Sequence, residues 1–129
     1  MNQSLTLWAA DRPDYPLAAV LSYSAADPYA VRLAFLQGRR ETAVYGFARE
    51  LLAAGLTDPA GQGDVMVGPH ECEAYLVLTL RPQDSYPFAL YVERDRIADF
   101  VEQTYRQVPH GRERVNVDAW IERILTEVA

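Results

Sequence analysis

The residues best suited to chemistry are His70 and Cys72, which lie two positions apart with Glu71 and Glu73 beside them. Alternate residues of a strand share one face, so this pair could hold a metal ion or form a Cys–His nucleophile. A zinc site needs three or four ligands at a recognisable spacing, and the other histidine, His110, lies far along the chain. We therefore interpret His70 as a loop histidine and Cys72 as a small apolar thiol.

Other short motifs also fall short of a site. Gly61 and Gly63 resemble the start of a dinucleotide-binding fingerprint, but the third glycine is absent and a strand is expected to follow, so a turn is predicted. Asp11 and Asp14 form a carboxylate pair in a solvated loop. The sequence contains no Gly-x-Ser-x-Gly elbow, phosphate-binding loop or His-Glu-x-x-His motif. We therefore predict no catalytic residue, no cofactor, no metal and no enzyme activity.

Arg39 and Arg40 lie together between two strand-like segments. Isolated charges at turns are ordinary solvated surface, so we interpret this pair as a hairpin tip and not as a phosphate clamp. The eight tyrosines are more informative, because tyrosine combines a large contact area with a polar tip and is enriched where proteins meet. Most of them are still expected in the core or on a sheet face.

Length and composition predict one domain over residues 1–129. Half of the residues are hydrophobic and 23% are charged, a balance typical of globular chains that need no disulfide or metal to fold. The longest apolar runs, at residues 17–21 and 75–80, are far shorter than the ~18 residues of a membrane-spanning helix. The sequence therefore predicts no transmembrane segment.

Cysteine usage and the first residues predict a cytoplasmic protein. The single cysteine cannot form an internal disulfide and suits a reducing compartment. Residues 1–8 lack the positive region and the long apolar region of a signal peptide. Eighteen acidic against twelve basic residues give a net charge of −6, which repels polyphosphate. Nucleic acid is therefore an unfavoured partner.

Hydrophobic periodicity predicts an α+β fold, with antiparallel β-sheets packed with helices. Seven strands are expected at residues 5–8, 17–24, 29–36, 41–47, 65–67, 74–80 and 87–92, and three helices at residues 48–55, 97–108 and 117–128. Residues 11–16 contain two prolines and are expected to form a loop. Gly55, followed by Leu56, is expected to end the first helix in a left-handed conformation.

Three stretches carry a resemblance to a known family. Residues 21–35 (LSYSAADPYAVRLAF) look like a hallmark strand–turn–strand, residues 47–56 (FARELLAAGL) look like a Phe-Ala-Arg-Asp/Glu-Leu-Leu helix, and residues 61–65 (GQGDV) look like a Gly-x-Gly-Asp-Val turn. In this order and spacing they resemble the SsgA-like family of actinobacterial sporulation-specific cell-division proteins, of the SsgA and SsgB type.

The resemblance implies a whirly-like fold, a homotrimer and a non-enzymatic regulator. Such a regulator would bind division proteins, FtsZ or SsgA-type paralogues, and help to place or stabilise the septal ring at division septa. The sequence adds a physical reason for self-association, since the strands offer more apolar surface than one domain need cover internally. Which residues bind the partner is unknown at this point. The alternative is a single-stranded nucleic-acid-binding protein of whirly-like fold, which needs a basic groove with stacking aromatic residues.

Overall fold

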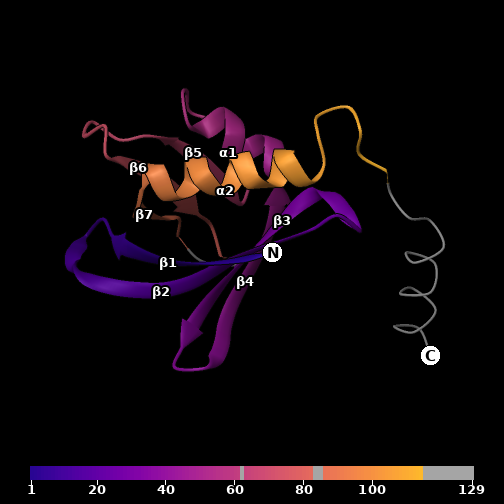
Figure 1. The fold of residues 1–129 in the computed structure, drawn as a ribbon. Helices are drawn as coiled ribbons and strands as arrows, with labels where there is room; N and C mark the ends of the chain where they lie inside the picture. The colour runs from indigo at the N-terminus through magenta and orange to yellow at the C-terminus, as the bar shows by residue number, and fades with distance from the viewer. Residues whose placement is uncertain (62, 83–85, 115–129) are drawn as a thin grey trace.

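The computed structural model describes residues 1–61, 63–82 and 86–114, which form seven strands and two helices (Figure 1). The strands are β1 (Asn2–Ala9), β2 (Arg12–Ser24), β3 (Asp27–Gln37), β4 (Arg40–Ala48), β5 (Val65–Pro69), β6 (Tyr75–Leu80) and β7 (Phe88–Glu93), and the helices are α1 (Arg49–Gly55) and α2 (Arg94–Gln107). The helix predicted over residues 117–128 lies outside the described residues. In the described ranges, neither helix is long and apolar enough to cross a membrane.

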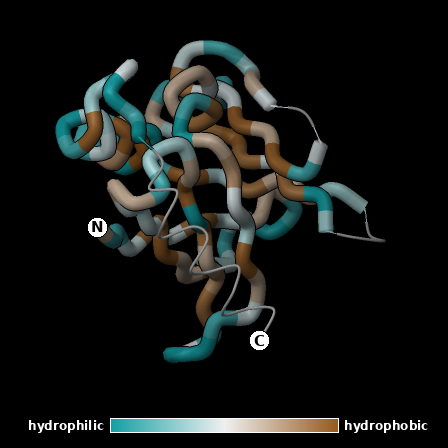
Figure 2. The backbone as a smooth tube through the Cα atoms, turned by 90° about the vertical axis from the view of Figure 1, so that its right-hand side faces the viewer, coloured by the Kyte–Doolittle hydropathy of each residue, from teal (hydrophilic) through white to brown (hydrophobic). Residues whose placement is uncertain are grey.

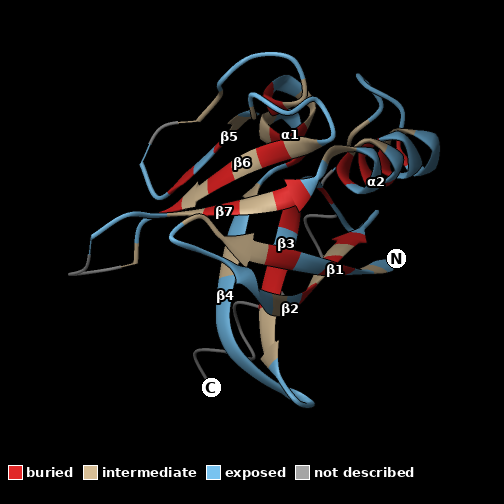
Figure 3. Cartoon of the chain, turned by 90° about the vertical axis from the view of Figure 1, so that its left-hand side faces the viewer, coloured by how far each residue is buried: buried red, intermediate tan, exposed pale blue. Residues whose placement is uncertain are grey.

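All seven strands join one antiparallel sheet in the order β4-β3-β2-β1-β7-β6-β5. The predicted α+β class with antiparallel strands is therefore confirmed. The sheet has two halves, β1–β4 and β5–β7, which are joined where Leu7, Trp8 and Ala9 pair with Val92, Tyr91 and Leu90 and where the N–H of Ala10 donates to the Ala89 carbonyl oxygen. Because this seam is short, the sheet curls, and in Figure 3 the strands of one half run across those of the other.

The core lies between the inner face of the curled sheet and the two helices. Alternating residues of the strands supply it, as where Leu76, Leu78 and Leu80 of β6 are buried while their neighbours are half exposed. From α2, Ile97 and Phe100 enter the same cluster at helical spacing. Each such side chain contributes about 1.5–3 kcal/mol by leaving water. Figure 3 shows the buried segments of β6 and β7 side by side in the sheet, with the buried residues of α2 next to them.

The loop predicted over residues 11–16 is wrong, because β2 begins at Arg12 and runs through both prolines. The pairing of β1 with β2 shifts between Trp8 and Ala9: Trp8 lies opposite Pro16, whereas Ala9 lies opposite Arg12. The extra residues of β2 therefore bulge out of the ladder. A bulge needs fewer backbone N–H donors than a regular ladder, so it can include proline without losing sheet pairing.

The left-handed conformation predicted for Gly55 is also wrong. The glycines with positive φ among the described residues are Gly38, Gly61, Gly63 and Gly111, whereas Gly55 is the last residue of α1 and is buried. A Cβ atom at this position would lie 2.6 Å from the Cβ atom of Val67 and 2.9 Å from its carbonyl oxygen. Glycine is thus needed for the close approach of α1 to β5, and not for the backbone angle.

Gly55→Ala should lower the free energy of unfolding by about 1 kcal/mol, and by no more than about 2 kcal/mol. Alanine favours the helix by about 1 kcal/mol, but overpacking against Val67 costs about 1–3 kcal/mol. Gly46→Ala is the matched control, since a Cβ atom there meets no atom within 4 Å. Urea unfolding followed by circular dichroism measures both variants. If Gly55→Ala is as stable as Gly46→Ala, the close approach does not constrain the fold.

Candidate functional site

In the described structure, His70 is not grouped with other residues that could bind a metal ion. His70 follows β5, and its Nδ1 atom accepts a hydrogen bond of 2.9 Å from the backbone N–H of Cys72 in the turn before β6. His70 is thus a turn histidine, as interpreted, whereas Cys72 is exposed and does not pack as an apolar side chain. Residues 1–61, 63–82 and 86–114 contain no group of three or more His, Cys, Asp or Glu side chains placed to hold a metal ion.

The remaining sequence motifs form no site among the described residues. Asp14 lies within β2, so the loop expected for the Asp11 and Asp14 pair is wrong, and both side chains are exposed. Gly61 and Gly63 have φ angles of 115° and 86°, and a strand, β5, follows them as expected. Arg39 and Arg40 are both exposed at the β3–β4 hairpin, which is the hydrophilic end at the bottom of Figure 2. The interpretation of this pair as a solvated hairpin tip is confirmed.

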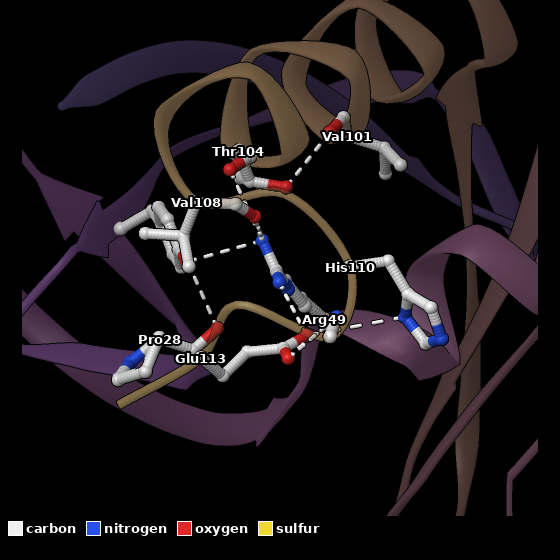
Figure 4. A network of polar contacts seen from close by, with 9 residues as sticks. Pro28, Arg49, Val101, Thr104, Val108, His110 and Glu113 are labelled. Atoms are coloured by element: carbon white, nitrogen blue, oxygen red, sulfur yellow. Dashed lines mark hydrogen bonds and ion pairs between the residues drawn. The ribbon is translucent and has the colours of Figure 1, made fainter. Parts of the chain in front are cut away.

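The site that the sequence did not reveal is a buried arginine. Arg49 begins α1, and only 2% of its surface is exposed. Its Nη1 atom donates to the Tyr23 hydroxyl at 3.1 Å and to the carbonyl oxygens of Thr104 and Val108 at 3.0 and 2.7 Å, while Nη2 donates to Glu113 Oε1 at 2.7 Å (Figure 4). One guanidinium therefore connects β2, α1, the end of α2 and the segment that follows α2.

The surroundings of Arg49 compensate its buried charge. The carbonyl groups of Thr104 and Val108 lie at the C-terminal end of α2, where the helix dipole favours a cation. The Tyr105 ring lies 4.0 Å from the guanidinium carbon, close enough for a cation–π interaction. Among the described residues, no buried side-chain nitrogen or oxygen lacks a hydrogen-bond partner. The network is fully satisfied, which is the condition under which a charge is tolerated in a core.

The protonation states in this network follow from its contacts. The pKa of Glu113 is lowered by its own backbone N–H group and by Arg49, and the N–H of Gly111 also donates to this carboxylate, at 2.8 Å. Burial raises the pKa of Tyr23 and of Tyr105. Tyr23 therefore keeps its hydroxyl hydrogen, which it donates to the Pro28 carbonyl oxygen at 2.9 Å. Every group of the network holds a fixed role at neutral pH.

Helical spacing was the one signal in the sequence that could have located Arg49. The buried residues of α1 are Arg49, Leu52 and Gly55, each three positions from the next, so the arginine lies on the apolar side of the helix. Its partners Tyr23 and Glu113 lie 26 and 64 positions away along the chain. Only the folded chain could identify them.

A second feature lies on the outer face of the sheet, away from the helices. Trp8 of β1, Tyr75 of β6 and Tyr91 of β7 alternate with buried neighbours, so their rings point outward. The ring of His70 joins them, with its centroid 4.6 Å from that of Tyr91 and 6.3 Å from that of Tyr75. We call these four residues the aromatic face. All four are half-buried, as is typical of side chains that can bind a partner.

The described geometry defines a protein class with a curled antiparallel sheet, a buried arginine network between sheet and helices, and aromatic rings on the outer surface of the sheet. Comparison with known proteins identifies the family. The family model described as Streptomyces sporulation and cell division protein, SsgA, matches residues 17–113. The chain therefore belongs to the SsgA family of sporulation and cell division proteins, and the resemblance found in the sequence is confirmed.

Individual relatives match over most of their length. The sporulation-specific cell division protein SsgB of Salinispora tropica is 40% identical, over 97% of this chain and 91% of the relative. SsgB of Streptomyces coelicolor is 36% identical, over 95% and 92%. The crystal structure of an SsgA-like sporulation-specific cell division protein from Thermobifida fusca has a TM-score of 0.79 at 32% identity, covering 95% of this chain and 93% of that one. The chain is thus similar to proteins of the SsgB type.

Arg49→Met should lower the free energy of unfolding by about 3 kcal/mol, because it removes a donor from two buried carbonyl groups, from the Tyr23 hydroxyl and from the half-buried carboxylate of Glu113. The matched control is Arg32→Met. Arg32 pairs with Glu41 at 2.6 Å, but both side chains are nearly half exposed, at 47% and 46%, so its loss should destabilise the fold far less. Urea unfolding of both variants tests the difference, and equal losses would mean that the buried network does not stabilise the fold.

Proposed function

We propose that this protein is a non-enzymatic regulator of sporulation-specific cell division that works by binding division proteins at septa in the cytoplasm. The observation that carries the proposal is family membership over nearly the whole chain, with relatives named as sporulation-specific cell division proteins. Fold alone would not carry it, since one fold hosts many functions. FtsZ and SsgA-type paralogues are the partners that we propose.

The aromatic face supports a binding role of this kind. Trp and Tyr contribute large, rigid contact areas and dominate the energetics of protein interfaces. Their placement on three neighbouring strands gives a surface that is fixed before a partner arrives, which lowers the entropic cost of binding. Single-stranded nucleic acid needs a basic groove beside stacking rings, whereas this chain carries a net charge of −6. We therefore favour a protein as the partner of this surface.

Retention by FtsZ filaments tests the proposal. The protein should sediment with FtsZ filaments at physiological salt and stay in solution when they are absent, because a regulator of the septal ring must recognise its polymer. A labelled single-stranded oligonucleotide, tested in the same buffer, should show no salt-dependent binding. If neither FtsZ nor an SsgA-type paralogue retains the protein, the proposal loses its support. Tight oligonucleotide binding would favour the nucleic-acid function instead.

We also propose that the protein assembles as a homotrimer. Large apolar side chains such as Val44, Met66 and Phe88 are 46%, 44% and 39% exposed on strands of the described sheet, and a cyclic trimer buries such surface through three copies of one contact. Light scattering after size exclusion should give three times the chain mass of 14.5 kDa. One chain mass over a range of micromolar concentrations would reject self-association, and two would reject the trimer.

A further inference from the structure

We propose that the aromatic face binds an extended segment of a partner protein that carries arginine or lysine. The inference rests on the proposed function, since it names the chemistry by which a division protein would be recognised. Three observations support it: the fixed geometry of the rings, the carboxylates beside them, and the poor fit of a second copy of this chain.

The rings are held in place by one another and by the sheet. The centroids of Trp8 and Tyr75 lie 6.1 Å apart with an interplanar angle of 86°, and those of His70 and Tyr91 lie 4.6 Å apart at 69°. These are edge-to-face contacts, which favour a defined ring orientation. Trp8 and Tyr91 lie opposite each other at the seam between the two halves of the sheet. The surface is therefore rigid and spans the seam.

Three exposed carboxylates lie on the segments that carry these rings. Glu93 lies directly opposite Tyr75 in the β6–β7 ladder, and Glu71 and Glu73 lie in the turn between His70 and Tyr75. In the part of the chain that the structure describes, none of the three forms a salt bridge. Their charges are therefore available to a ligand from outside.

The positive side chains near these carboxylates do not neutralise them. The guanidinium of Arg94 is directed to α1, where it donates to the Leu56 carbonyl oxygen at 3.5 Å. Arg96 shares a surface depression with Glu93 and is exposed. Arg12 lies opposite Ala9, next to Trp8, and is exposed, but the exposed Asp11 and Asp14 flank it. Two exposed arginines, Arg96 and Arg12, therefore face five carboxylates, and this side of the sheet has a net negative charge.

Rings and nearby carboxylates match the chemistry of a basic side chain. A guanidinium or ammonium group that lies over Tyr or Trp is attracted by the ring quadrupole, and a carboxylate within reach adds a charge-assisted hydrogen bond. A phosphate backbone would be repelled by the same carboxylates. A second copy that used the same face would bring three further carboxylates against these three, which is unfavourable.

The test uses the full-length protein and a blocked nonapeptide with arginine at every third position and glycine or serine between. A second peptide carries citrulline in place of arginine, which keeps the shape and removes the charge. Calorimetry should show binding of the arginine peptide that weakens with salt, and binding of the citrulline peptide that is at least ten-fold weaker. Equal affinities for the two peptides would overturn the proposal.

Variants locate the binding on the protein. Tyr91→Leu and Glu93→Gln should each weaken binding of the arginine peptide by about five-fold or more. Glu93 precedes α2 but its side chain makes no capping hydrogen bond, so Glu93→Gln should keep the fold even if Tyr91→Leu does not. Tyr29→Leu and Glu50→Gln are the matched controls, because both residues are exposed on other elements. Equal weakening by the controls would overturn the proposal.

Two further readouts separate this proposal from the others. If the arginine peptide binds as expected but FtsZ and its paralogues are not retained, the proposed function fails while the surface stands. If Tyr91→Leu and Glu93→Gln are retained by FtsZ as well as the unmodified protein, the surface is not the docking site and this proposal fails alone. A change in assembly mass in Glu93→Gln would assign the face to a contact between copies of this chain, which would also overturn it.

Discussion

The fold depends on the burial of one positively charged side chain, Arg49, in the core. The guanidinium of Arg49 is buried, and a charge there is stable only when each of its donors has a partner. Those partners come from β2, from the end of α2 and from Glu113. Meeting this requirement fixes where α1 begins, where α2 ends and where the chain turns after it. These hydrogen bonds are directional, so they define the relative positions of α1, α2 and the segment after α2 more closely than apolar packing alone would.

The curl of the sheet determines which surface is closed and which stays open. Its two halves share only three residue pairs at the seam, so the inner surface can close around the helices while the outer surface stays open. Gly55 allows α1 to approach β5 closely on the inner side. On the outer side, the same seam brings Trp8 next to Tyr91. The geometry that encloses the core therefore also assembles the aromatic face.

The buried network and the aromatic face serve different purposes. In the network, the Glu113 carboxylate and the Tyr23 hydroxyl are engaged in hydrogen bonds. Membership of the SsgA family gives the cellular process, while the fold supplies a rigid support and the surface supplies recognition. In the proposal made for the aromatic face, its nearby carboxylates select among partners by charge, which affects specificity and association rate more than affinity.

Local patterns in the sequence were enough to predict the class of fold and the family. Alternation in β6 and helical spacing in α2 are local patterns, and burying apolar side chains forces them into strands and a helix. Predictions from local sequence were wrong where residues distant in the sequence determine the structure. Pro13 and Pro16 fit within β2 because the pairing with β1 shifts. Gly55 is needed because a larger side chain would collide with Val67. The partners of Arg49 and the four aromatic side chains come from separate parts of the chain. Only tertiary structure decides such contacts, since a hydrogen bond or a ring contact depends on distance in space and not on position in sequence.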